Sequence, residues 1–91
     1  MEFEWDNGNS GKNFKSHNVS DGECEEVFFD PKKKIALDVF HSGAETRYIL
    51  LGETSKHRLL FLVFTIRKGR LRIISARDIS KKEKHLYEKK S

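Results

Sequence analysis

An α+β fold is the class that this sequence predicts: a small antiparallel β-sheet, a meander, flanked by two N-terminal helices and one C-terminal helix. The strongest indication is residues 59–77, where eight apolar or β-branched residues run into a glycine-containing turn and a second strand-like run follows. Two S-x-x-E capping boxes, at Ser20 with Glu23 and at Ser80 with Glu83, predict helices on either side. No repeat or linker divides the chain, so we expect one domain over residues 1–91.

The hairpin predicts two sheet faces of opposite character. If Lys68 and Gly69 form the loop, Arg67 lies opposite Arg70 and alternate side chains share a face. The first face is then rich in arginine: Phe61, Val63, Thr65, Arg67, Arg70, Arg72 and Ile74. The second face is wholly apolar and suited to helix packing: Leu62, Phe64, Ile66, Leu71 and Ile73. Clustered guanidinium groups need an anion, a carboxylate or water beside them, so the first face is a candidate phosphate-binding surface.

The N-terminal segment predicts a strand and a helix. Residues 2–6 alternate acidic and aromatic side chains, as in a short half-buried strand. A first helix is expected over residues 9–17, capped by Asp6 or Asn9, and Asn18 suits a left-handed helix end.

A second helix is expected from the capping box at Ser20 to about Phe29, because Pro31 stops it. Strands are expected over residues 35–40 and 46–54, which would make the sheet an antiparallel meander.

The final helix is capped by Asp78 or Ser80. Its apolar stripe is narrow, with Ile79, Leu86 and Tyr87, so this helix docks weakly or lies against a partner.

Composition limits the classes of function. A hydrophobic fraction of 36% is enough for a modest core and favours a folded domain over disorder. Cys24 is the one cysteine, which excludes an internal disulfide and a multi-cysteine zinc site. The chain has no long apolar run and an acidic start unlike a signal peptide, so a cytoplasmic protein without a membrane partner is expected.

The net charge of +4 is unevenly distributed. Residues 1–45 hold five Lys/Arg and ten Asp/Glu, whereas residues 46–91 hold thirteen and four. The basic half is therefore the expected contact for a polyanion.

No recognised enzyme motif is present, and the four histidines do not have a metal-ligand spacing, so neither a metal nor a cofactor is expected. The remaining groups are suited to cutting RNA without a metal, since arginines offset phosphate charge and a histidine, lysine or glutamate moves protons. RNA supplies its own nucleophile, the 2′-hydroxyl.

Short motifs along nearly the whole chain resemble those of the BrnT family of toxins from bacterial toxin-antitoxin pairs. They are FEWD at residues 3–6, Asn13, Lys15, His17, Val19-Ser20, VFFDP at residues 27–31, His41-Ser42, ETR at residues 45–47, Gly52, T-x-R at residues 65–67, RIISAR at residues 72–77, Glu83 and Tyr87. The family usually has Lys-His-Gly where this chain has Ser16-His17-Asn18, and commonly has E-E-A where this chain has Gly22-Glu23-Cys24.

The resemblance implies a RelE-like fold and a small ribonuclease that inhibits translation by cleaving RNA. It also implies a BrnA-like DNA-binding antitoxin as partner, which neutralises the toxin and represses the shared operon. A complex of two toxins and two antitoxins, a 2:2 heterotetramer, follows from a dimeric antitoxin. DNA would be contacted only through the antitoxin.

Nine residues are candidates for the site. With the resemblance in view, the expected catalytic residues are Lys15, His17, Glu45, Arg67, Arg72 and Arg77. The expected RNA-binding residues are Arg47, Lys68 and Arg70. The arginines would stabilise phosphate charge, and His17, Glu45 or Lys15 would move protons.

Simpler interpretations stay open. Arg67 and Arg72 can pair with carboxylates such as Glu45 or Glu53, and His17 can be an ordinary surface histidine at a helix end. The alternative function is a non-catalytic module whose basic sheet face binds RNA or an acidic protein segment.

Overall fold

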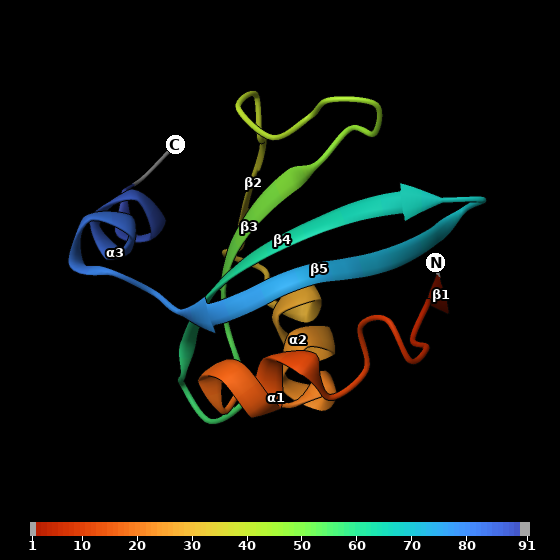
Figure 1. Cartoon of the computed structure of the whole chain (residues 1–91). Helices are drawn as coiled ribbons and strands as arrows, with labels where there is room; N and C mark the ends of the chain where they lie inside the picture. The colour runs from red at the N-terminus through yellow and green to blue at the C-terminus, as the bar shows by residue number, and fades with distance from the viewer. Residues whose placement is uncertain (1, 90–91) are drawn as a thin grey trace.

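A twisted hairpin forms the centre of the computed structural model, which describes residues 2–89 (Figure 1). It consists of β4 (Leu59–Arg67) and β5 (Arg70–Asp78), in a five-stranded sheet with three α-helices. The other elements are β1 (Glu2–Phe3), α1 (Lys12–His17), α2 (Asp21–Glu26), the 3₁₀ helix η1 (Val27–Phe29), β2 (Lys34–Leu37), β3 (Tyr48–Glu53) and α3 (Lys81–Glu88). The predicted α+β class, with two N-terminal helices and one C-terminal helix, is confirmed.

The sheet is mixed rather than purely antiparallel. Its strand order is β1-β5-β4-β3-β2, and β2 to β5 form the predicted antiparallel meander. At the other edge β1 runs parallel to β5, with Glu2 opposite Arg70 and Phe3 opposite Leu71. The prediction of a simple meander is therefore wrong at this edge. No tight turn joins β1 to β5, so nothing local imposes an antiparallel direction.

The predicted hairpin turn is confirmed. Arg67 lies opposite Arg70, and both Lys68 (φ 50°) and Gly69 (φ 77°) have the positive φ that a two-residue type I′ loop requires. Glycine takes this conformation without strain, which explains its place at the second loop position.

A β-bulge changes the predicted faces in the second half of β5. Phe64 lies opposite Ile73, but Val63 lies opposite Ser75, so Ile74 is an additional residue. The prediction that Ile74 lies on the arginine-rich face through regular alternation is therefore wrong. Beyond the bulge Ser75 and Arg77 take that face, whereas regular alternation would have put Arg77 on the opposite side.

The first helix is shorter than predicted. It begins at Lys12 after Gly11, which has φ 72° and makes no side-chain cap, so capping by Asp6 or Asn9 is wrong. Those two side chains belong to an earlier turn, in which the Asp6 backbone N–H donates to Asn9 Oδ1 at 2.9 Å. The helix end is as predicted, since Asn18 has φ 57°.

Both predicted capping boxes are confirmed. At Ser20 with Glu23, and at Ser80 with Glu83, each serine side chain accepts from the glutamate backbone N–H and each glutamate accepts from the serine N–H. The second helical segment ends at Phe29 as predicted, its last three residues forming η1. The strands predicted over residues 35–40 and 46–54 are confirmed as the shorter β2 and β3.

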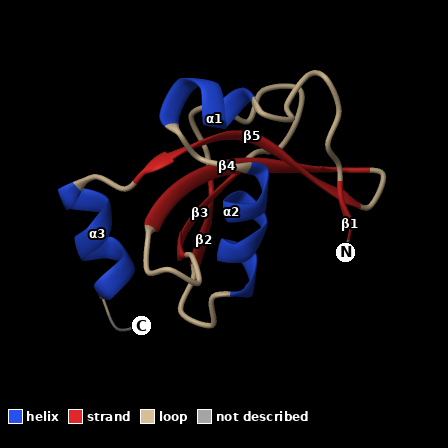
Figure 2. Ribbon diagram, turned by 90° about the horizontal axis from the view of Figure 1, so that it is seen from below, coloured by secondary structure: helices blue, strands red, loops and turns tan. Residues whose placement is uncertain are grey.

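Helices α1 and α2 pack on one face of the sheet, and α3 stands apart from them near the end of β5 (Figure 2). The core joins residues from the segments around α2 to residues from the sheet: Val19, Cys24, Val27, Leu50, Leu60, Leu62, Phe64, Ile73 and Ala76. No residue of α3 is buried, and its contacts with the rest of the chain include the Tyr87 hydroxyl, which donates to Asp30 Oδ2 at 2.6 Å. We call the other side of the sheet the open face; it carries Phe61, Val63, Thr65, Arg67, Arg70, Arg72, Ser75 and Arg77.

Arg58 joins the helix ends to the hairpin. Its guanidinium donates to Asp78 Oδ1 at 2.7 Å and to Glu23 Oε2 at 3.1 Å. It also donates to the backbone carbonyls of Asn18 at 2.8 Å and His17 at 3.4 Å. One side chain therefore satisfies two carbonyls at the C-terminal end of α1 and two carboxylates.

Acid should destabilise the protein. Arg58 lowers the pKa of Asp78 below its ordinary 3.8, and Arg77 lowers the pKa of Glu83 below its ordinary 4.5. Because these folded-state pKa values lie below the unfolded ones, the unfolded chain binds more protons as the pH falls. The stabilisation is complete above about pH 5 and is lost as the pH falls through the folded pKa values.

The measurement is the thermal midpoint from pH 7 to pH 3, which should be level at first and fall below about pH 5. Glu88→Gln is the control, because Glu88 forms no salt bridge within residues 2–89, and its acid profile should match that of the parent protein. A midpoint that rises on acidification would contradict the stabilising role of these pairs.

Candidate functional site

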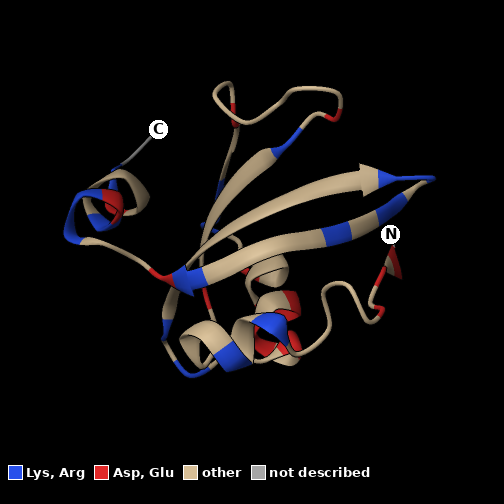
Figure 3. Cartoon of the chain, in the orientation of Figure 1, with Lys and Arg blue, Asp and Glu red and all other residues tan. Residues whose placement is uncertain are grey.

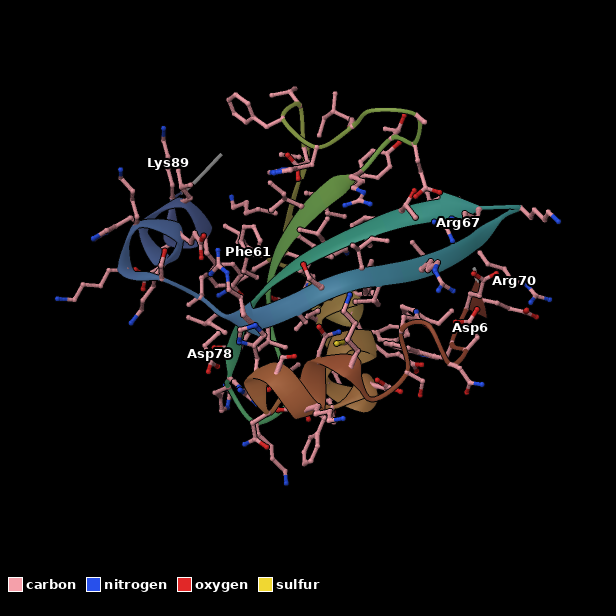
Figure 4. The ribbon with its side chains drawn as sticks, in the orientation of Figure 1. Asp6, Phe61, Arg67, Arg70, Asp78 and Lys89 are labelled. Atoms are coloured by element: carbon pink, nitrogen blue, oxygen red, sulfur yellow. The ribbon has the colours of Figure 1, made fainter. Side chains whose placement is uncertain are left out.

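The hairpin end of the open face gathers most of the predicted site residues. Figure 4 shows Arg67 and Arg70 at this end, near Asp6, with Phe61 and Asp78 at the other end. Figure 3 shows the basic positions of the hairpin end facing acidic positions of the N-terminal segment and of the β2–β3 loop. We call this group the arginine cluster; it comprises Arg47, Arg67, Lys68, Arg70 and Arg72 with Glu2, Glu4, Asp6 and Glu45.

Arg67 is held by a carboxylate from the β2–β3 loop. Its Nε and Nη2 donate to the two oxygens of Glu45 at 2.5 and 3.0 Å, a bidentate pair. This contact lowers the pKa of the Glu45 carboxyl, which is therefore ionised at neutral pH and only a weak base. The ion pair suggested by the sequence is thus present, while 45% of the Arg67 side chain is exposed and can reach a ligand.

Arg72 is more enclosed. Its Nη1 donates to Glu4 Oε1 and Asp6 Oδ2, both at 2.9 Å, and its Nη2 donates to Asp6 Oδ1 at 3.0 Å. Only 12% of its side chain is exposed. A Cβ at Gly8 would lie 2.9 Å from Arg72 Nη2, so glycine lets the N-terminal loop close over the guanidinium. Arg72 therefore anchors this loop as well as contributing charge to the cluster.

The remaining cations of the cluster are less constrained. Arg70 Nε lies 3.5 Å from Glu2 Oε2 with more than half of its side chain exposed. Arg47 and Lys68 form no salt bridge within the described residues. The cluster thus contains five cations and four carboxylates. A phosphate of RNA would have to compete with these carboxylates for the arginines, because the site is not an unpaired basic patch.

Arg77 lies at the other end of the open face. Its guanidinium carbon is 4.0 Å from the centre of the Phe61 ring, and its Nη1 and Nη2 donate to Glu83 at 2.8 and 2.7 Å. The contact with Glu83 ties β5 to α3, and Phe61 is far from the labelled hairpin arginines in Figure 4. The bulge gives Arg77 the same face as Arg67 and Arg72, but the structure does not bring it into the cluster.

Lys15 and His17 lie on α1, exposed to solvent. Helix α1 begins beside the bulge, where Lys12 Nζ donates to the Ile74 carbonyl at 3.3 Å, and it runs away from the hairpin end. At its end His17 lies close enough to Asp78 for its charge to lower the pKa of that carboxyl. The predicted catalytic set is therefore divided between the hairpin end, α1 and the α3 end of the sheet.

Sequence reasoning did not select two residues beside the arginine cluster. His41 Nδ1 lies 3.1 Å from each carboxylate oxygen of Asp38, which is 5% exposed. His41 also lines a concavity of about 360 Å³ with Glu45 and Arg47. Two signals were available: the His41-Ser42 motif of the family resemblance, and the i, i+3 spacing of an aspartate and a histidine.

Cys24 is not available for nucleophilic chemistry. It is fully buried in the core, and burial raises the pKa of its thiol to about 12. The thiolate that attack would require is therefore not formed at neutral pH.

Two further observations concern the described part of the chain. Within residues 2–89 no three His, Cys, Asp or Glu side chains are grouped as metal ligands would be. None of the helices described is both long and apolar enough to cross a membrane.

Comparison with known proteins identifies the family of the chain. Residues 5–83 match a family model of ribonuclease toxins from type II toxin-antitoxin systems. The chain belongs to this family, which is named BrnT. A type II family implies an antitoxin as partner. No curated protein matches the chain.

Proposed function

We propose that this protein is a metal-independent endoribonuclease that inhibits translation by cutting RNA at the arginine cluster. The single observation that carries the proposal is the grouping of Arg67 and Arg72 on the open face with Glu45 and Arg47 of the β2–β3 loop, in a chain of a ribonuclease toxin family. The RNA supplies the 2′-hydroxyl as nucleophile. The protein therefore needs to hold the phosphate, move protons and position the 2′-hydroxyl for attack on phosphorus.

Arg67 has the main electrostatic role in this proposal. Exposed ion pairs are weak, so a phosphate oxygen can replace one Glu45 oxygen on its guanidinium. Arginine suits this exchange because its planar fork binds phosphate as well as carboxylate. Arg72 supports the negative charge that develops on the phosphorane, while Arg47, Lys68 and Arg70 hold flanking phosphates.

The resemblance predicts a catalytic role for three further residues, Lys15, His17 and Arg77, and this role stays a prediction. Their separation from the arginine cluster favours contacts with more distant nucleotides of a long RNA over contacts with the cleaved phosphate. Separate alanine variants cleaving a short and a long RNA would distinguish these roles.

Cleavage in EDTA is the direct test of the reaction. Purified protein should cut a single-stranded RNA equally well with and without EDTA, and should leave the 2′-deoxy version of the cleaved nucleotide intact. Loss of cleavage in EDTA with recovery in magnesium would reject the metal-free mechanism. RNA binding without cleavage under every condition would instead favour the alternative, a non-catalytic module with a basic sheet face.

Glu45→Gln should separate binding from catalysis. Removing the carboxylate frees Arg67 for phosphate, so RNA should bind at least as tightly as before. If Glu45 also moves a proton, kcat should fall about 100-fold or more. Measuring KM and kcat separately checks both effects, and a KM that falls or stays level while kcat is undiminished would show that Glu45 only restrains Arg67.

The antitoxin partner is proposed to be a BrnA-like DNA-binding protein that forms a 2:2 complex and covers the arginine cluster. Exposed apolar side chains give it further contacts beyond the predicted stripe on α3, at Ile35, Leu37, Val39 and Phe40. Light scattering of the co-expressed pair would give the stoichiometry, and hydrogen exchange would map the covered face. An arginine cluster as open to exchange in the complex as in the free toxin would reject direct occlusion.

A further inference from the structure

A buried carboxylate orients an exposed imidazole beside the arginine cluster. The Asp38 side chain follows β2 and is 6% exposed, whereas the His41 side chain is 69% exposed. His41 Nδ1 lies 3.1 Å from both Asp38 oxygens, and those oxygens have no other hydrogen-bond partner within the described residues. Burying a carboxylate with a single hydrogen-bond partner costs free energy unless that partner is held in place. The Asp38–His41 pair is therefore a fixed part of the fold rather than a chance surface contact.

The β2–β3 loop fixes this pair through backbone contacts. The Asp38 N–H donates to the Arg47 carbonyl at 2.8 Å, and Ser42 Oγ donates to the Asp38 carbonyl at 2.5 Å. The Arg47 N–H in turn donates to Ser42 Oγ at 2.9 Å. The loop is thus closed on itself on both sides of His41, and the imidazole is presented from a short, hydrogen-bonded turn.

The position of His41 links it to the proposed phosphate site. His41, Glu45 and Arg47 line the same concavity, and Glu45 also binds Arg67. The charged groups around the imidazole are therefore Asp38, Glu45 and Arg47, with Arg67 paired to Glu45. A nucleotide whose phosphate lies on Arg47 and Arg67 would place its ribose beside His41.

We propose that His41 is the general base of RNA cleavage and that Asp38 is its positioning residue. The inference rests on the proposed function, since it assigns the proton acceptor of that same reaction. Asp38 accepts the Nδ1–H, which leaves the Nε2 lone pair directed away from Asp38 and free to accept a proton.

In the proposed step Nε2 takes the proton of the 2′-hydroxyl while the 2′-oxygen forms a bond to phosphorus. The bond from phosphorus to the 5′-oxygen breaks, and the leaving oxygen takes a proton from water. The products are a 2′,3′-cyclic phosphate and a 5′-hydroxyl end, and the imidazolium then returns its proton to solvent.

Three variants, two at histidines and one at Asp38, test the assignment with one single-stranded RNA as substrate. His41→Gln should lower kcat about 100-fold or more while KM changes less than about threefold, and it should remove the acid limb of the pH profile. Asp38→Asn should lower kcat about tenfold or more and keep that limb, because the imidazole remains but loses its orientation. His57→Gln is the matched control, since His57 makes a similar contact with Glu53 at 3.4 Å at the other end of the sheet, and it should leave kcat unchanged.

Rescue of activity by added imidazole distinguishes a general base from a residue that only supports the structure. His41→Gly should regain activity in imidazole, in proportion to its concentration, if the missing group is the base. Full activity in His41→Gln with an unchanged pH profile, while the parent protein cleaves RNA, would overturn the assignment without touching the proposed function. Loss of the acid limb in His17→Gln instead would assign the base to α1 and also overturn it. A parent protein that does not cleave RNA at all would reject the proposed function itself.

Discussion

Arg67→Ala should lower the rate of RNA cleavage by about 100-fold to 1,000-fold, the effect expected when one charged group is removed from a developing anion. The fold should tolerate this change, because Arg67 is 45% exposed and its partner Glu45 is in a loop. Exposed ion pairs contribute little to stability, so the thermal midpoint should move by only a few degrees.

Two controls accompany this variant. Lys56→Ala removes the same charge from the exposed β3–β4 turn and should leave cleavage unchanged. Arg67→Lys keeps the charge but loses the planar guanidinium, so its cleavage rate should lie between those of Arg67→Ala and Lys56→Ala. Equal effects of Arg67→Ala and Lys56→Ala would show that only net charge matters and would remove Arg67 from the site.

Arg58→Ala should be the most destabilising single arginine substitution in the described chain. It removes the guanidinium donor from the carboxylates of Glu23 and Asp78 and from the carbonyls of His17 and Asn18, although Glu23 keeps the Ser20 N–H of the capping box. A quarter of the Arg58 side chain is exposed, so water compensates part of the loss, and we expect about 2–3 kcal/mol. In a domain of this size that corresponds to a midpoint lower by roughly 10–20 °C.

Arg58→Lys separates charge from geometry at the same position. A lysine ammonium cannot reach four acceptors in a plane, so we expect most of the loss to remain. RNA cleavage by Arg58→Lys at low temperature, where the protein is folded, should equal that of the parent chain. A midpoint unchanged in Arg58→Ala would show that this network contributes nothing to stability.

The hairpin was predictable because its signals are local. The I′ turn at Lys68 and Gly69 and the alternation up to Ile73 depend only on neighbours in sequence, and both are confirmed. The same holds for the capping boxes of α2 and α3. The bulge at Ile74 was not predictable, because an additional residue in one strand leaves no local sequence mark, although it decides the face on which Arg77 lies.

The contents of the site were only partly predictable, because its contacts join distant segments. Arg67 with Glu45 was foreseen as a possible pair, but the partners of Arg72 come from the N-terminal loop at Glu4 and Asp6, and no periodicity reveals them. The parallel pairing of β1 with β5 brings that loop beside the hairpin.

RNA should be bound and cut at the hairpin end of the open face. The most direct measurement is an NMR titration of the protein with a single-stranded RNA whose 2′-hydroxyls are methylated, so that it binds but cannot react. Binding at this end should give the largest shifts in the guanidinium and backbone signals of Arg47, Arg67 and Arg72, with smaller changes on α1. Shifts confined to α1 and α3, with the signals of these three arginines unmoved at saturation, would contradict it.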